Sequence, residues 1–175
     1  MFSAPTAVTD IFILRKHCEE IARTLPIPYP FNSKAFIEAL IKYRGRRIEL
    51  VEMTVDRDTP CGMFVATPEA DYIFYAANTS PLHQEHIIAH EAAHILYNHG
   101  GTGALGEAVA PLLMKNLSPE LITRVLGRTA YSESDEAEAE MLASVILIRA
   151  GRADPPTLTS RELECGVNRF GAIFG

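Results

Sequence analysis

Five of the six histidines in this 175-residue sequence lie in one short segment, between positions 83 and 99. Within that segment, His90, Glu91 and His94 form the pattern His-Glu-x-x-His. Four residues are about one turn of a helix, so the two imidazoles project from the same face and can bind one metal ion together. Neutral imidazole is a good ligand for Zn²⁺. The spacing therefore predicts a zinc site with His90 and His94 as ligands.

Glu91 is turned by about 100° from His90 around the helix axis, which would place its carboxylate beside the ion rather than on it. A general base that takes a proton from a metal-activated water needs that position. The helix is apolar on almost every side, from Ile87 to Leu96, as is typical of a buried helix. Buried histidines and carboxylates need polar partners, which a metal would supply. The alternative is a chance match to the motif, in a helix pair without metal.

A hydrolytic zinc site needs a third protein ligand and an open position for water. The spacing found in metzincins would place a third histidine at position 100, which is Gly100. His99 comes one residue too early, and we expect it near the helix end, where an imidazole interacts favourably with the helix dipole. A glutamate on a later helix is the better candidate for the third ligand.

Glu136 is that candidate, because it shares one helical face with the small residues Ala139 and Ala143. Small side chains on this face would let the two helices approach closely and leave Glu136 aimed at the metal. Glu140 lies one turn further along. We expect it either to hydrogen-bond one of the two histidines from behind or to replace Glu136 as the ligand.

The other polar residues near Glu136 are expected to contribute less. Glu138 is predicted to point away from the metal, and Glu133 and Asp135 to complement the positive end of the helix dipole. The same dipole role is the alternative for Glu136. Tyr131, shortly before this helix, would either pack against its neighbours or help to stabilise an oxyanion.

Hydrophobic periodicity and capping residues predict the elements around this site. The predicted helices are Val8–Leu25, Asn32 or Ser33 to Tyr43, Ser80–Asn98, Pro119–Gly127, Ser134–Ala150 and Ser160–Phe170. The predicted strands are Ile48–Met53, Cys61–Thr67 and Tyr72–Ala77, the last two forming a hairpin, with a loop at Gly101–Pro119. Strands and helices do not alternate, which favours an α+β fold. The strand ending near Ala77 is expected to line a cleft and to pair with an extended substrate.

The composition narrows the class of protein. The length fits one compact domain, and a net charge of −6 argues against a broad nucleic-acid-binding face. Arg44, Arg46 and Arg47 are expected to be solvated at a helix end. No apolar run approaches the ~20 residues of a membrane-spanning helix, and no export signal is recognisable. The three scattered cysteines are expected to be reduced thiols, which favours a cytoplasmic location.

At these motifs the chain resembles the ImmA/IrrE family of metallopeptidase-like proteins, a zincin group. The resemblance covers the strand Tyr72–Tyr75, the His90–His94 motif and the Glu136–Ala143 segment, about the middle half of the chain. The chain departs from the family at Ala92 and the residue after it, where Leu-Gly is common, and at Glu140, where Asn or Asp is common. Small residues are kept where the two helices would meet.

The resemblance implies a single zincin-like domain over residues 1–175, with a small antiparallel sheet packed on the motif helix and surrounding helices. Its parts would be N-terminal helices in 1–46, the sheet in 47–78, the motif helix in 79–99 and C-terminal helices in 118–175. It also implies that His90, His94 and Glu136 hold zinc and that Glu91 is the catalytic base.

The implied activity is zinc-dependent hydrolysis of a peptide bond in a protein substrate, with a transcriptional repressor as one candidate. The alternative is a non-catalytic or regulatory zinc-binding component of a toxin–antitoxin or mobile-element system, which would act through protein contacts. In both cases we expect a protein partner, no direct binding to nucleic acid and no membrane. The sequence leaves the oligomeric state open.

Overall fold

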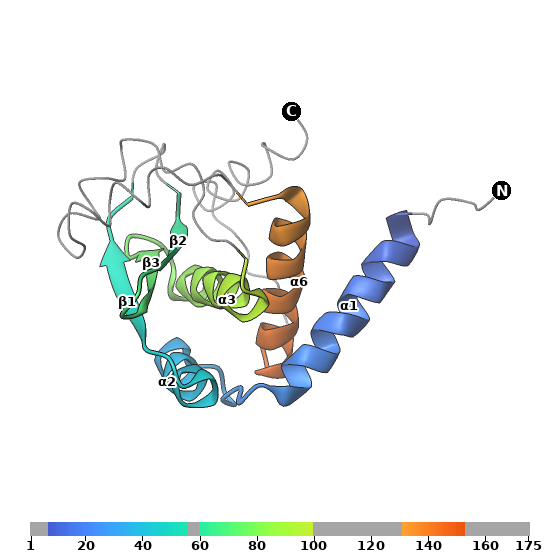
Figure 1. Ribbon diagram of the computed structural model, residues 1–175, viewed down its shortest axis with the longest axis horizontal. Coiled ribbons are helices and arrows are strands. Elements are labelled where there is room, and N and C mark those ends of the chain that lie inside the picture. Colours follow the sequence, from blue (N-terminus) through green and yellow to red (C-terminus); the bar gives the residue numbers. More distant parts are fainter. Residues whose placement is uncertain (1–6, 56–59, 100–130, 153–175) are drawn as a thin grey trace.

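Figure 1 shows the computed structural model of the chain, which describes residues 7–55, 60–99 and 131–152. Within these ranges the chain forms four helices and one three-stranded sheet, so the predicted α+β class is confirmed. The elements are α1 (Ala7–Thr24), α2 (Ser33–Arg44), β1 (Ile48–Met53), β2 (Gly62–Ala66), β3 (Asp71–Ala76), α3 (Pro81–Tyr97) and α6 (Glu133–Arg149). The loop predicted at Gly101–Pro119 and the helices predicted at Pro119–Gly127 and Ser160–Phe170 lie outside the described residues.

Capping residues fix the starts of three helices close to their predicted positions. The side chains of Asn32 and Ser80 each accept a hydrogen bond from a backbone amide three residues further on, and so begin α2 and α3. Ser132 and Asp135 form a reciprocal capping box at the start of α6, in which each side chain accepts from the other residue's amide. These local hydrogen bonds explain why the sequence pattern located the helices.

The end of α3 lies where the sequence predicts it, at Asn98. This residue caps the helix with a left-handed backbone, at a φ of 55°. Asparagine tolerates this conformation better than most residues do. The amide of His99 then donates to the carbonyl of His94 at 3.0 Å. The chain therefore turns back toward the helix it has just left.

The sheet has the order β1-β3-β2 and is mixed rather than antiparallel throughout. β2 and β3 form the predicted antiparallel hairpin, whereas β1 pairs with β3 in parallel. The chain leaves β1 and returns as β2 with a gap between the two strands, which β3 then fills. β3 is consequently paired on both edges, so the expectation that it pairs with an added substrate strand is wrong. The outer edges of the sheet belong to β1 and β2.

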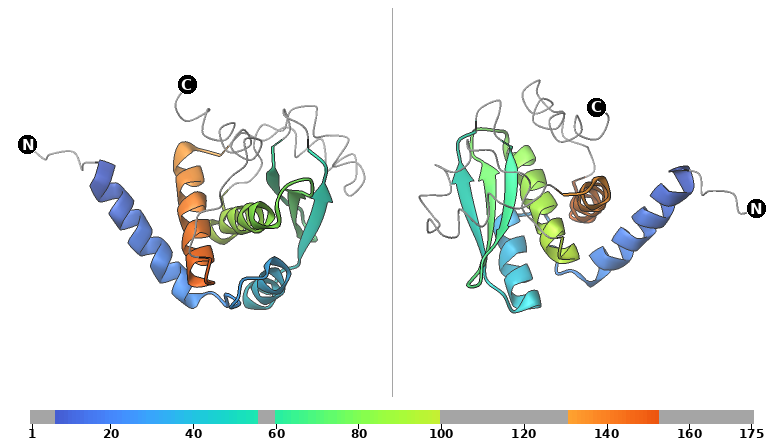
Figure 2. Two further views of the ribbon diagram at one scale, coloured as in Figure 1. Left: turned by 180° about the vertical axis from the view of Figure 1, so that it is seen from behind. Right: turned by 45° about the horizontal axis from the view of Figure 1, so that its top comes forward.

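α3 packs between the sheet on one side and α6 on the other, as the two orientations of Figure 2 show. α1 packs on α6 in turn. Alanines on both α3 and α6 are fully buried, among them Ala92, Ala93, Ala139 and Ala143. The predicted close approach of the two helices is therefore confirmed, and it brings their polar side chains into contact.

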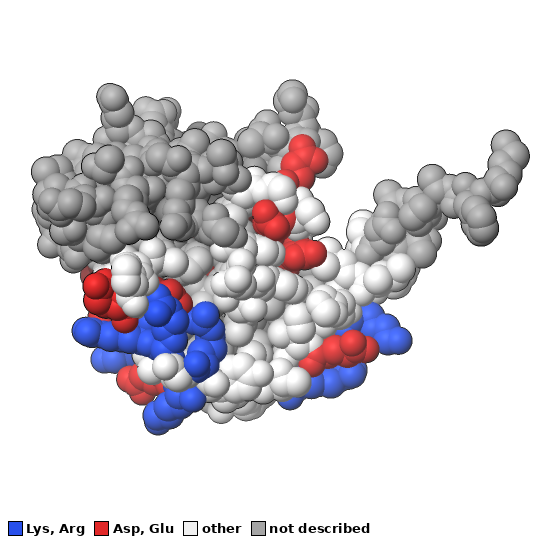
Figure 3. All heavy atoms as spheres, in the orientation of Figure 1, with Lys and Arg blue, Asp and Glu red and all other residues white. Residues whose placement is uncertain are grey.

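The expected solvated arginines have a buried partner. Asp71, at the start of β3, is 2% exposed. Its carboxylate accepts from Arg44 at 2.8 Å and from Arg46 at 2.9 Å. Figure 3 shows basic side chains gathered over α2 and the adjoining end of the sheet, at the lower left, and acidic side chains along α6. Two of the three clustered arginines thus anchor α2 to the sheet.

The cysteines differ from one another. Cys18 is a buried free thiol, and burial raises its pKa. Cys61 is disulfide-bonded, so the expectation of reduced thiols is wrong for this residue and no longer argues for a cytoplasmic location. Among the described residues, no helix combines the length and the apolar character needed to cross a membrane.

Candidate metal centre

The two histidines of the motif and Glu136 meet where α3 and α6 are in contact. His90 is 2% exposed and His94 is fully buried. Their Nε2 atoms lie 3.1 Å apart. The carboxylate of Glu136 places Oε2 at 3.3 Å from Nε2 of His90 and Oε1 at 3.8 Å from Nε2 of His94. Three ligand atoms from two helices therefore converge, as the sequence predicted.

These separations match what a tetrahedral metal ion requires. Zn²⁺ bonds of about 2.0–2.1 Å at tetrahedral angles put neighbouring ligand atoms about 3.3–3.4 Å apart. The Nε2 atoms of His90 and His94 lie 3.1 Å apart, and the two oxygens of Glu136 lie 3.3 Å from the first and 3.8 Å from the second, which is close to that value. One carboxylate and two imidazoles suit Zn²⁺ and also other divalent first-row ions. The group can therefore hold a metal ion with one position left for a further ligand.

Glu140 contacts the Nδ1 atom of His90, on the side of the ring away from the candidate metal. Oε2 of Glu140 lies 3.3 Å from Nδ1 of His90 and 3.2 Å from Nε2 of His86. Burial disfavours the charged carboxylate, but hydrogen bonds and attraction from the two histidines outweigh it and lower the pKa of Glu140. A charged Glu140 is suited to fix the ring of His90. Glu140 thus lies beside His90, where a supporting residue was predicted, and Glu136 is the residue that contacts both Nε2 atoms.

On the side away from the candidate metal, His94 contacts a residue for which the sequence predicted no such role. Nδ1 of His94 lies 2.9 Å from Nδ1 of His99. Nε2 of His99 lies 3.0 Å from Oε2 of Glu138 and 3.5 Å from Oδ1 of Asp135. Glu138 was predicted to point away from the metal. That prediction did not include the contact with His99, which follows α3 and reaches Glu138. The signal that could have located this contact is Asn98, a residue able to reverse the chain directly before a histidine.

Asp135 combines two roles. Its Oδ2 atom accepts from the amide of Ser132, as the predicted helix-end role requires. Burial by itself would raise the pKa of Asp135, but hydrogen bonds with Ser132 and the electrostatic effect of the neighbouring His99 together outweigh it and lower this pKa. Its other oxygen faces His99. The capping interpretation is therefore confirmed but incomplete.

Aromatic rings complete the enclosure of these imidazoles. Tyr131 stacks on His94, with ring centroids 3.7 Å apart and an interplanar angle of 10°. Tyr97 stacks on His99 in the same way, at 5.1 Å and 5°. Its hydroxyl lies 3.2 Å from the sulfur of Cys18 on α1. The ring of Tyr131 thus packs against a candidate ligand, the first of its two predicted roles.

Glu91 lies one residue along α3 from His90 and is only 2% exposed. Burial of a charged carboxylate is costly unless hydrogen bonds or an opposite charge compensate it. Its position in α3 is the one from which the sequence pattern predicts a general base. His90, His94 and Glu136 thus converge where α3 and α6 meet, and Glu91 follows His90 along α3.

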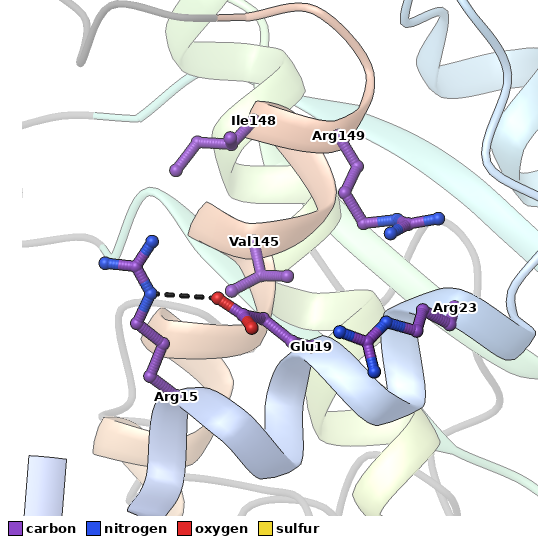
Figure 4. A pocket seen from close by; sticks show the side chains of 6 residues that line it. All are labelled: Arg15, Glu19, Arg23, Val145, Ile148 and Arg149. Atoms are coloured by element: carbon purple, nitrogen blue, oxygen red, sulfur yellow. Dashed lines mark hydrogen bonds and ion pairs between the residues drawn. The ribbon is translucent and has the colours of Figure 1, made fainter. Parts of the chain in front are cut away.

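A separate pocket lies between α1 and α6 (Figure 4). It is lined by Arg15, Glu19, Arg23, Val145, Ile148 and Arg149. Arg15 donates to Glu19 at 3.0 Å within α1. This pocket contains one carboxylate and no imidazole among its lining residues, so it is not a candidate for the metal centre.

No protein-family model and no curated protein matches this chain. The functional interpretation therefore depends on the geometry of the site and on the motif itself.

Proposed function

We propose that the protein is a zinc-dependent metallopeptidase that hydrolyses a peptide bond in a protein substrate. The observation that carries this proposal is the convergence of ligand atoms from His90, His94 and Glu136, with the buried carboxylate of Glu91 one residue along α3. A metal held only for structural reasons does not require such a carboxylate. The resemblance of the two motifs to the ImmA/IrrE family supports the same reaction.

Each residue would have a distinct role in that reaction. Bound Zn²⁺ would supply Lewis-acid activation of water and of the substrate carbonyl. His90, His94 and Glu136 would hold the ion and leave one position open, as hydrolytic sites do. Glu91 would accept the proton of the attacking water and then transfer it to the leaving amine.

The experiment that tests this function compares the wild-type protein with Glu91→Gln. Both are loaded with Zn²⁺ and incubated with a proteome-derived peptide library, and new peptide termini are identified by mass spectrometry. We expect cleavage by the wild type and loss of cleavage in Glu91→Gln, with unchanged zinc content and unfolding temperature, because glutamine cannot accept the proton. Glu85→Gln, on the same helix, is the matched control and should cleave normally.

The same experiment separates the regulatory alternative from the peptidase. A zinc protein that acts only through protein contacts would produce no new termini. Cleavage that is equal in the wild type and Glu91→Gln would come from a contaminant and would also contradict the proposal.

A further inference from the structure

The ring of His94 is fixed on the side that faces away from the candidate metal. Its Nε2 atom faces Nε2 of His90 and Glu136, whereas its Nδ1 atom lies 2.9 Å from Nδ1 of His99. Nε2 of His99 in turn lies 3.0 Å from Glu138. A continuous row of polar contacts therefore leads from the metal centre to a carboxylate near the start of α6.

Once a metal is bound to His94, each ring nitrogen in this row can be assigned as a hydrogen-bond donor or acceptor. A metal on Nε2 of His94 leaves the ring proton on Nδ1, which must donate to Nδ1 of His99. His99 is then an acceptor at Nδ1 and carries its own proton on Nε2. That proton is donated to Glu138. Every nitrogen in the row has one assigned role.

The geometry of His99 is itself constrained. Its side chain is 7% exposed, and its ring lies parallel to Tyr97 at 5.1 Å. The left-handed backbone of Asn98 and the amide bond to His94 bring it back against α3. A ring held in this way can orient its neighbour rather than follow it.

We propose that His99 and Glu138 are positioning residues that fix the tautomer and the orientation of His94 as a metal ligand. Metal-bound histidines usually donate their second ring proton to a carboxylate or a carbonyl, and loss of that partner weakens metal binding. Here a second imidazole lies between the ligand and the carboxylate. This inference rests on the metal site of the proposed function, and it assigns to the site two residues that the motif does not contain.

His99, Asp135 and Glu138 also have the donor types of a cation site of their own. One oxygen of Asp135 is already committed to the capping box. A second cation on Nε2 of His99 would also displace the proton donated to Glu138. The positioning role requires no change in any of these contacts. The test described below distinguishes it from binding of a second cation.

The test measures Zn²⁺ affinity of the full chain by competition with a chelator, in the wild type, His99→Phe and His99→Gln. Phenylalanine keeps a flat ring beside Tyr97 but removes both nitrogens, whereas glutamine can still accept the proton of His94. We expect His99→Phe to bind Zn²⁺ about 10–100-fold more weakly, and His99→Gln to recover most of this loss. The visible absorption of the Co²⁺-substituted protein should shift in His99→Phe and return in His99→Gln.

Two further variants keep the result interpretable. His17→Phe makes the same change at another imidazole near Tyr97, with ring centroids 6.1 Å apart, and should leave Zn²⁺ affinity unchanged. Glu138→Gln retains an acceptor oxygen but loses the charge, so its affinity should fall less than that of His99→Phe. This variant tests the inference even if His99→Phe does not fold.

Three results would overturn the inference. Equal Zn²⁺ affinity and an equal Co²⁺ spectrum in His99→Phe and the wild type would show that His94 needs no such partner. Two zinc ions per wild-type chain and one in His99→Phe would show that His99 is a ligand of a second cation. A wild-type chain that binds no zinc would overturn the proposed metal site, and this inference with it.

Discussion

His90 and His94 have the same predicted role and lie one helical turn apart, but different partners hold their rings. His90 contacts a carboxylate directly, with Glu140 at 3.3 Å from its Nδ1 atom. The Nδ1 atom of His94 instead contacts His99, at 2.9 Å, and His99 in turn contacts the carboxylate of Glu138. The first partner comes from the α6 helix that also supplies Glu136, and the second lies beyond the end of α3.

This difference has a structural cause and a consequence. The His90 side is complete as soon as α3 and α6 pack together, because all of its polar groups lie on those two helices. The His94 side also needs the turn at Asn98, where the backbone adopts a left-handed conformation. One half of the site therefore depends on helix pairing alone, and the other half depends in addition on how the chain leaves α3.

The largest effect is expected from the ligands themselves. His90→Ala and His94→Ala should each abolish stoichiometric binding of zinc, because either change leaves only two protein ligands. Elemental analysis of each purified variant, with its unfolding temperature as a check on folding, measures this. Full zinc content in either variant would show that the two histidines are not equivalent ligands and that another residue completes the site.

Loss of the direct carboxylate should have the next largest effect. Glu140→Gln should weaken Zn²⁺ binding by about 10–100-fold, because the charge behind His90 is removed. Chelator competition measures the affinity. Glu133→Gln, an exposed acidic residue on the same helix, is the matched control. Equal affinities in the two variants would contradict a supporting role for Glu140.

The helix contact that the two sides share can be tested through stability. Ala139 is fully buried in the core that α3 and α6 share, so Ala139→Leu should lower the free energy of unfolding by about 1–3 kcal/mol through overpacking. Ala137→Leu places the same side chain on the exposed face of α6 and should be nearly neutral. Urea denaturation of both variants gives the comparison. An unchanged stability in Ala139→Leu would mean that the two helices are not closely packed.

The smallest expected effect is coupling between the two sides. If Glu140 and His99 orient different rings, the losses in Zn²⁺ binding free energy in Glu140→Gln and His99→Phe should add in the double variant to within about 0.5 kcal/mol. A double-mutant cycle of zinc affinities measures this. A larger departure from additivity would mean that the two sides act as one network.

The sequence predicted the fold and the His90 side of the site because both depend on local patterns. Capping residues such as Ser80 and Ser132 mark helix starts, and the four-residue spacing of His90 and His94 places them on one face of α3. Glu136 and Glu140 could be predicted because they repeat at helical spacing on a face with small residues.

The remaining features depend on contacts between distant parts of the chain. The parallel pairing of β1 with β3 follows from where the chain returns, which no local pattern records. The same holds for the contact of His99 with Glu138, since helical spacing on α6 alone gives no position for a residue beyond the end of α3. The burial of Asp71 against Arg44 and Arg46 is a further contact of this kind.

We expect one metal ion to lie between the ligand atoms of His90, His94 and Glu136, at the contact of α3 and α6. Crystals of protein purified without added zinc, measured with X-rays above and below the zinc absorption edge, test it most directly. We predict one anomalous peak, within bonding distance of Nε2 of His90, Nε2 of His94 and a carboxylate oxygen of Glu136. The absence of a peak there, or a single peak beside His99 and Glu138 instead, would contradict this account.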